Sequence, residues 1–146
     1  MRILLLLFSC CLLTVNSIAQ EEVAAVKRPI ELLFEGMRKA DSAQVAACFA
    51  PSAIMQTIAV SKDGKVVVRE QKVSEFAASI KNVLPGAIDE QIVFETIKID
   101  GELALVWTPY QFIYNGKRMH TGVNSFTLVK IDGEWKINYV IDTRKR

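Results

Sequence analysis

The chain has 146 residues, 51% of them hydrophobic, with 18 basic and 16 acidic side chains, a net charge of +2 and a single histidine. That length is the usual size of one domain. The near balance of charge gives no electrostatic reason for binding to nucleic acid or to an anionic membrane surface, so we expect neither partner.

Residues 1–19 have the composition of a secretory signal peptide. Arg2 precedes an apolar run, and small residues precede a cleavage site after Ala19. The sequence therefore predicts export, to a periplasm or out of the cell, with no membrane attachment after cleavage. Two alternatives stay open. One is an uncleaved anchor, although the run is shorter than the ~20 residues that a bilayer requires. The other is lipid attachment at Cys10, where the preceding residues match a lipoprotein signal poorly.

Cleavage at this site would leave one cysteine, Cys48. A single cysteine forms no internal disulfide, and Cys48 lies in the apolar phase of a short predicted helix, so we expect it to be buried as a small hydrophobic residue. With one histidine and one buried cysteine, the usual nitrogen and sulfur ligands of a metal site are lacking. We expect no metal site, and no motif points to a cofactor.

Three helices are predicted in the part of the chain before Pro85. The first covers 21–40, and Pro29 either opens it or kinks it. Asp41 is placed to cap a short second helix, and a third begins near Ser74 and ends before Pro85. Apolar residues recur at helical spacing in the first helix: Val26, Ile30, Leu33, Phe34 and Met37.

The other segments alternate with the period of strands. A hairpin is predicted within 53–70, and four more strands follow the third helix, joined by Asp-Gly or Asn-Gly turns that are typical of an antiparallel meander. The pattern therefore predicts an α+β fold in which a long sheet curls over the helices. The predicted strands are 53–60, 65–70, 89–99, 102–114, 118–131 and 134–142.

Two stretches carry a recognisable pattern: LLFEGMRKADSAQVAACFAPSA (32–53) and HTGVNSFTLVKIDGEWKINYVIDTRKR (120–146). Both, with the order of elements, resemble the nuclear transport factor 2 superfamily, which includes SnoaL-like and ketosteroid-isomerase-like proteins. The resemblance implies that residues 20–146 form a single cone-shaped domain, three N-terminal helices packed in a strongly curved, mostly antiparallel sheet. It also implies a pocket at the wide end of the cone and frequent dimers. The second stretch is similar to small exported bacterial members without an assigned reaction.

The predicted strand 102–114 is apolar in both phases, with Leu103, Leu105 and Trp107 in one and Val106 in the other. A sheet with one face in water alternates with polar residues, so both faces should be covered. The helices cover one face. A second subunit is expected on the other, which predicts a homodimer, and a loop or the N-terminal segment is the alternative cover.

A candidate site lies where His120 begins a strand face that also holds Asn124 and Phe126. Sparse polar groups on an apolar wall are typical of a pocket lining. Gly122, between them, leaves space for a neighbour or a ligand. The turn at 115–116 places Tyr110 opposite His120.

Asp142 is expected beside the His120 strand, because the turn at 132–133 pairs residue 124 with about 141. A carboxylate there could orient the imidazole for proton transfer. Asp142 with Arg144 could equally form a surface ion pair of little consequence.

The leading hypothesis is therefore an exported protein that binds a small, largely apolar molecule without a cofactor. The alternative is an acid–base enzyme of the isomerase, dehydratase or cyclase type, with His120 or Asp142 as the base. A non-catalytic interaction module with a filled interior is a further alternative. The predicted lining consists of Phe34, Met37, Trp107, Tyr110, His120, Asn124 and Tyr139.

Overall fold

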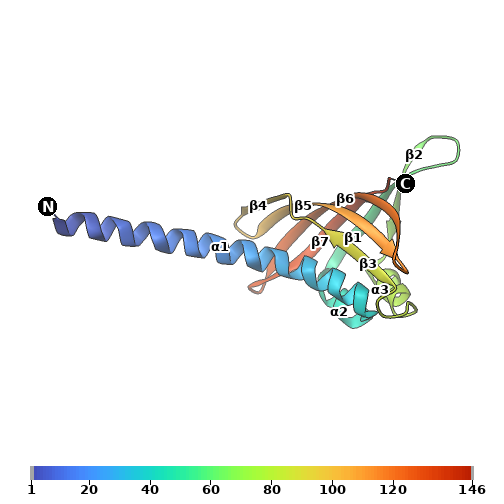
Figure 1. Cartoon of the computed structure of the whole chain (residues 1–146), viewed down its shortest axis with the longest axis horizontal. Coiled ribbons are helices and arrows are strands. Elements are labelled where there is room, and N and C mark those ends of the chain that lie inside the picture. The colour runs from blue at the N-terminus through green and yellow to red at the C-terminus, as the bar shows by residue number, and fades with distance from the viewer. Residues whose placement is uncertain (1, 146) are drawn as a thin grey trace.

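A computed structural model describes the backbone of residues 2–145 and the side chains of residues 19–145. The predicted signal peptide, 1–19, therefore lies almost entirely outside the residues whose side chains are described. The helices and strands follow one another along the chain as Figure 1 shows. They are α1 (Arg2–Lys39), α2 (Ser42–Ala47), β1 (Phe49–Val60), β2 (Val66–Gln71), α3 (Val73–Ile80), β3 (Ile88–Ile92), β4 (Thr96–Asp100), β5 (Leu103–Tyr114), β6 (Lys117–Ile131) and β7 (Glu134–Thr143).

Helices α2 and α3 begin within one residue of the predicted positions, whereas α1 begins at Arg2, well before the predicted start at residue 21. Pro29 lies inside α1 and not in its first turn. Ala40 adopts a left-handed φ of 58°, which ends α1. The carboxylate of Asp41 then accepts a hydrogen bond from the backbone nitrogen of Gln44 at 2.9 Å, so the predicted cap of α2 is confirmed.

The strands form one seven-stranded sheet in the order β2-β1-β7-β6-β5-β3, with β4 also beside β5. Among the described strands, only the pair β1 and β7 is parallel, so the sheet is mostly antiparallel, as predicted. Asn115 and Asp132 take left-handed φ values of 49° and 51° in the tight turns that join β5 to β6 and β6 to β7. The Asn-Gly and Asp-Gly hairpins of the second half of the chain are therefore confirmed.

The edge of the sheet beside β5 differs from the prediction, because the expected single strand is divided into β3 and β4. Ile92 pairs with Tyr110 and Thr96 pairs with Trp107, so three residues of the edge span two residues of β5. This extra residue is a β-bulge. It lies opposite Pro109, which has no backbone N–H to donate.

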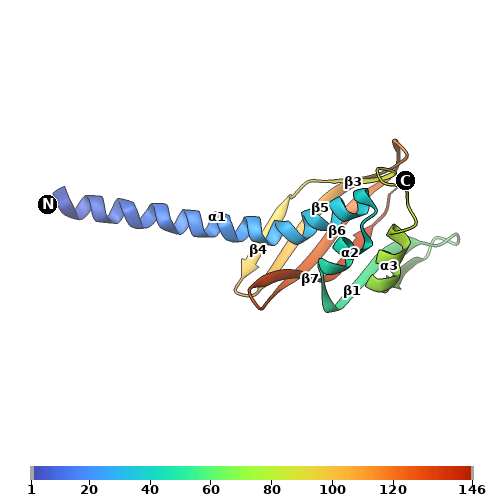
Figure 2. The same cartoon turned by 90° about the horizontal axis from the view of Figure 1, so that it is seen from below.

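The three helices cover the concave face of the sheet (Figure 2). The curled sheet does not close into a barrel, and side chains from α1 and from the inward phase of β5, β6 and β7 pack as a core in part of its interior. This is the predicted cone-shaped α+β fold. The largest fully buried hydrophobic residues are Phe126, Ile30, Leu128, Ile137, Val26 and Val45.

The convex face of the sheet is apolar where β5 crosses it. Leu103, Leu105 and Trp107 are 45%, 48% and 44% exposed, while Ala104 and Val106 between them are buried. The predicted two-sided apolar pattern of this strand is thus present, with the helices covering one side.

Within the part of the chain that the structure describes, no helix combines the length and the apolar character needed to cross a membrane.

Candidate functional site

A cavity of about 390 Å³ lies between the concave face of the sheet and the helices α1 and α3. Its walls are mostly aliphatic and aromatic, with Phe34 of α1 meeting Phe126 of β6 edge to face at 6.3 Å between ring centres. Polar side chains gather at one end, where β3, β5, β6 and the end of β7 meet. That combination is typical of small-molecule sites. The polar and charged groups that line it are Gln56, Gln71, Ser79, Glu90, Tyr110, His120, Asn124, Asp142 and Arg144.

The hydroxyl group of Tyr110 is the centre of the polar end. It lies 2.9 Å from the carbonyl oxygen of Thr143, 3.2 Å from Oδ2 of Asp142 and 3.2 Å from Nδ1 of His120. The single phenolic proton serves one acceptor at a time, and whether Nδ1 of His120 donates to the phenol oxygen or accepts from it depends on the tautomer of the imidazole.

Burial, together with the negative charges of Asp142 and Glu90, raises the pKa of Tyr110 above its ordinary value. The phenol therefore stays protonated across the physiological range and acts in the site as a hydrogen-bond donor.

Gly122 makes this arrangement of Tyr110 possible. A Cβ atom at this position would lie 2.8 Å from Cε1 of Tyr110 and 1.8 Å from the carbonyl oxygen of Thr143. The absent side chain thus leaves room for a neighbouring ring and for the last residues of the chain. The sequence predicted that Gly122 leaves space for a neighbour or for a ligand. In the structure, Tyr110 and the backbone of Thr143 occupy that space.

His120 stacks on Phe112, with 4.8 Å between ring centres and an interplanar angle of 11°. The two residues pair across β5 and β6, and Tyr110 pairs with Gly122. The predicted pairing of Tyr110 with His120 is therefore displaced by two residues. The two-residue turn alone would place Tyr110 opposite Thr121, and the bulge after Phe112 shifts the register by one more. Tyr110 still reaches the imidazole on a diagonal, with ring centres 5.7 Å apart.

Glu90 of β3 completes the polar end and is not among the predicted residues. The side-chain amide of Asn124 donates a hydrogen bond to Oε1 of Glu90 at 2.9 Å. Burial raises the pKa of Glu90 to about 7, helped by the nearby charge of Asp142, although the hydrogen bond from Asn124 acts in the opposite direction. A carboxyl group with such a pKa can hold or release a proton near neutral pH.

Asp142 and Arg144 form a partly buried pair. Nε of Arg144 donates to Oδ2 of Asp142 at 2.9 Å, and the carboxylate side chain is 14% exposed whereas the guanidinium side chain is 55% exposed. Asp142 pairs with Asn124 across β6 and β7, within one residue of the predicted register. The carboxylate therefore faces the cavity, and the pair is not confined to the surface.

Five predicted lining residues do line the cavity: Phe34, Met37, Tyr110, His120 and Asn124. Trp107 and Tyr139 do not. Trp107 alternates with the inward residues Val106 and Thr108, and the pairing of β5 with β6 runs without a break through Pro109, so its indole lies on the convex face.

Tyr139 is turned away by a bulge in β7. The register of β6 with β7 shifts after Thr127, so that Ile137 and Val140 face inward and Tyr139 faces outward. Its hydroxyl donates to Oε1 of Gln56 at 2.8 Å.

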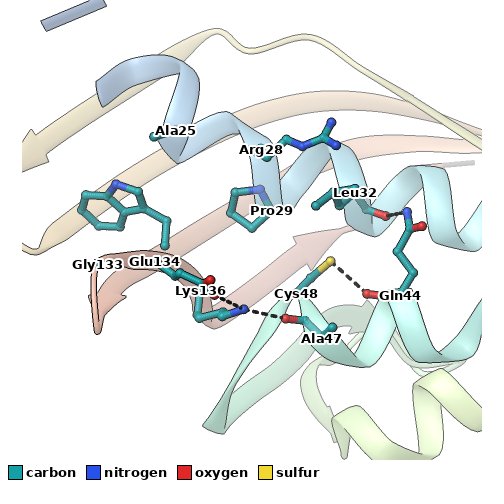
Figure 3. A pocket seen from close by; sticks show the side chains of 11 residues that line it. Ala25, Arg28, Pro29, Leu32, Gln44, Ala47, Cys48, Gly133, Glu134 and Lys136 are labelled. Carbon is teal, nitrogen blue, oxygen red and sulfur yellow. Dashed lines mark hydrogen bonds and ion pairs between the residues drawn. The ribbon is translucent and has the colours of Figure 1, made fainter. Parts of the chain in front are cut away.

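A second cavity, of about 410 Å³, lies between α1, α2 and the turn before β7 (Figure 3). Several of its polar groups bind one another. Lys136 pairs with Glu134 at 3.0 Å, and the amide nitrogen of Gln44 donates to the carbonyl oxygen of Leu32 at 2.8 Å. The thiol of Cys48 donates to the carbonyl of Gln44. Although slightly larger, this cavity is the weaker candidate, because Trp135 is the one aromatic residue in its described lining, whereas four phenylalanines, Tyr110 and His120 line the first.

Cys48 is buried, as predicted, and burial raises its pKa to about 11. The thiol is therefore protonated at neutral pH and unreactive as a nucleophile. Among the described residues, no group of three or more His, Cys, Asp or Glu side chains is arranged to hold a metal ion.

A protein-family model described as "Putative lumazine-binding" matches residues 21–139. The chain belongs to this family. Among curated proteins, none is similar enough to the chain to count as a match.

Solved structures agree with the cone fold of this lumazine-binding-like chain. An NTF2-like protein of unknown function from Shewanella baltica OS155 is 21% identical, with a TM-score of 0.69 over 86% of this chain and 95% of that chain. An NTF2-like protein of unknown function from Silicibacter pomeroyi DSS-3 is 15% identical, with a TM-score of 0.67 over 87% and 98%. A "Putative Scytalone Dehydratase" from Novosphingobium aromaticivorans DSM 12444 is 16% identical, with a TM-score of 0.68 over 90% and 89%. At these identities the likeness shows the nuclear transport factor 2-like fold alone.

Proposed function

We propose that this chain binds a small, largely apolar ring compound in the cavity lined by Phe112 and His120. One observation carries the proposal: a cavity of about 390 Å³ has aromatic walls and a cluster of polar groups at one end. The family description, which names lumazine, supports a flat heterocycle as the first compound to test. An unfilled interior also favours binding over the alternative of an interaction module.

Thermal unfolding in the presence of lumazine and a panel of apolar ring compounds tests this proposal. A ligand at about 100 times its Kd should stabilise the protein by about 2.7 kcal/mol, which raises Tm by several degrees. The shift should be lost in His120→Ala, which removes the stacked imidazole, and retained in Met119→Ala, whose neighbouring side chain is exposed. If no compound of a broad panel raises Tm of the wild type, the binding function is wrong.

A second candidate function is acid–base chemistry on the bound molecule, of the isomerase, dehydratase or cyclase type. The pKa of Glu90, raised to about 7, favours it, because efficient proton transfer requires a group that titrates near the working pH. Asp142 or His120 would be the other partner. Turnover of a bound compound, lost in His120→Gln, would support this function, and binding without turnover would exclude it for that compound.

The apolar strip on the convex face, formed by Leu103, Leu105 and Trp107, is proposed as the contact of a homodimer. Trp107→Lys should convert a dimeric wild type to a monomer in light scattering, because a buried lysine at the contact is unpaired. Val66→Lys should leave the dimer intact, because Val66 lies on the far edge strand and is 70% exposed. A monomeric wild type would contradict the proposal.

Export is proposed from the composition of residues 1–19. N-terminal sequencing of the protein recovered from a bacterial periplasm or culture medium should begin at Gln20. A chain recovered only from the cytoplasm with Met1 intact would contradict it.

A further inference from the structure

The polar end of the cavity between α1, α3 and the sheet holds two carboxyl groups and one guanidinium group. Asp142 is bound by Arg144 through Nε at 2.9 Å. Glu90 receives its hydrogen bond from the neutral amide of Asn124. Asp142 therefore has a positively charged partner, whereas the hydrogen-bond donor to Glu90 is neutral.

The groups that face Glu90 come from every strand around it. Phe112 lies directly across β5, Asn124 and His120 come from β6, and Asp142 follows on β7. Tyr110 is a donor to acceptor oxygens at the other side of the cluster. Within the described residues, the helices contribute apolar side chains and one serine to the lining, and no charged group. Charge in the cavity is thus carried by Glu90, Asp142 and Arg144, and His120 is the other titratable side chain near Glu90.

The walls around this end are rich in aromatic rings, which attract cations through their faces. An organic anion would meet two carboxyl groups and a guanidinium already engaged by Asp142. A neutral compound would leave Glu90 protonated below its pKa and, above it, ionised without a counter-charge. A cation with an apolar body matches both the charged end and the walls. The phenyl rings in the lining are those of Phe34, Phe76, Phe112 and Phe126.

We propose that the cavity binds an organic amine, with its ammonium group against the carboxylate of Glu90 beside Asp142 and its apolar ring or chain among the phenylalanine rings. This assignment rests on the proposed binding function and narrows it to one ligand class.

Proton release follows from the assignment. The pKa of Glu90 is raised to about 7 in the protein, so near neutral pH a large part of the free protein carries this proton. An ammonium group bound to the carboxylate requires the ionised form, so binding displaces the proton into the solvent. Affinity should therefore rise about tenfold from pH 6 to pH 8.

Calorimetric titration of the purified protein with three matched probes tests the assignment: phenethylamine, 2-phenylethanol and phenylacetate. At pH 8 the amine should bind at least ten times more tightly than the alcohol, and phenylacetate most weakly. At pH 6, where most of the free protein holds the Glu90 proton, titrations in two buffers of different ionisation enthalpy should show close to one proton released per amine bound. Glu90→Gln should abolish both the preference for the amine and the proton release. Asp89→Asn, whose side chain pairs with Arg38 outside the cavity, should leave them unchanged.

Equal affinity for amine and alcohol in the wild type, tighter binding of phenylacetate, or an unchanged amine preference in Glu90→Gln would each overturn the assignment. Failure of all three probes to bind would overturn it as well. In that case, the broader binding function would stand only if a neutral ring compound raised Tm in the unfolding assay, so the two failures are distinguishable.

Discussion

Replacing Glu90 with glutamine is expected to remove most of the pH dependence of the unfolding free energy between pH 5 and pH 8. Glu90 has an ordinary pKa of 4.5 when unfolded and a pKa of about 7 in the folded protein, mainly because of burial. The folded protein therefore holds the proton more tightly than the unfolded chain does over this interval. Stability must fall as the pH rises from about 4.5 to about 7 and then become constant for this group.

The size of the effect follows from the difference of the two pKa values. Each unit corresponds to about 1.36 kcal/mol, so the wild type should lose on the order of 3 kcal/mol of unfolding free energy through Glu90 across the interval. Glutamine keeps the shape and can still accept the hydrogen bond from Asn124, but it carries no charge at any pH. Above pH 7 the variant should therefore be more stable than the wild type, and below pH 4.5 the two should be similar.

Urea unfolding at a series of pH values measures this difference directly. Asp89→Asn is the matched control, because Asp89 is the preceding residue of β3 and its partner Arg38 lies outside the cavity. The control should keep the pH slope of the wild type. If Glu90→Gln kept the pH slope of the wild type, the raised pKa of Glu90 would not be the cause of that slope, and the prediction would be wrong.

The hairpins of the second half of the chain were predictable because their turns are local. Asn-Gly and Asp-Gly pairs favour left-handed backbone conformations, and Asn115 and Asp132 adopt them in the structure. The helix cap at Asp41 was predictable for the same reason, since the capping hydrogen bond spans three residues. Interactions between residues so close in the chain can be predicted from the local sequence.

Bulges were not predictable, and they decide which side chains face the cavity. Strict alternation from Trp135 and Ile137 would turn Tyr139 inward, whereas the bulge in β7 turns it outward and brings Asp142 to the site. In β5, by contrast, the ladder to β6 continues without a shift through Pro109 and leaves Trp107 on the convex face. A single residue of register reverses the face of everything beyond it.

The sequence contains a weak indication that Glu90 faces the cavity. Ile88, Glu90 and Ile92 share one phase of β3, so an acid stands between two isoleucines that face inward. An acid in an apolar phase is more often at an exposed edge than in a cavity. Only the approach of Asn124 from β6, which depends on the register of three strands, distinguishes the two cases.

Gly122→Ala is expected to destabilise the protein by roughly 3–5 kcal/mol. The cause is that the added methyl group has no room, and not that alanine strains the backbone. The added Cβ would lie 1.8 Å from the carbonyl oxygen of Thr143, and a backbone oxygen cannot turn aside as a side chain can. The segment after β7 would have to move away from β6. Such a movement breaks the hydrogen bonds of Thr121 with Lys145, at 2.9 and 2.7 Å, and the one from Tyr110 to Thr143. Each lost bond costs about 1 kcal/mol, and the overlap adds to that cost.

Gly64→Ala separates this effect from the general cost of replacing a glycine. Gly64 lies at the tip of the β1–β2 hairpin with a φ of +80°, and a methyl group added there would meet no atom within 4 Å, so its substitution should cost only the ~1–2 kcal/mol of a left-handed alanine. Urea unfolding of both variants measures the difference. Because Tyr110 loses its acceptor only in Gly122→Ala, that variant should also lose ligand stabilisation, while Gly64→Ala keeps it. Equal costs for the two variants would mean that the last residues of the chain move away from β6 freely, and that the close approach at Gly122 does not hold Tyr110 in place.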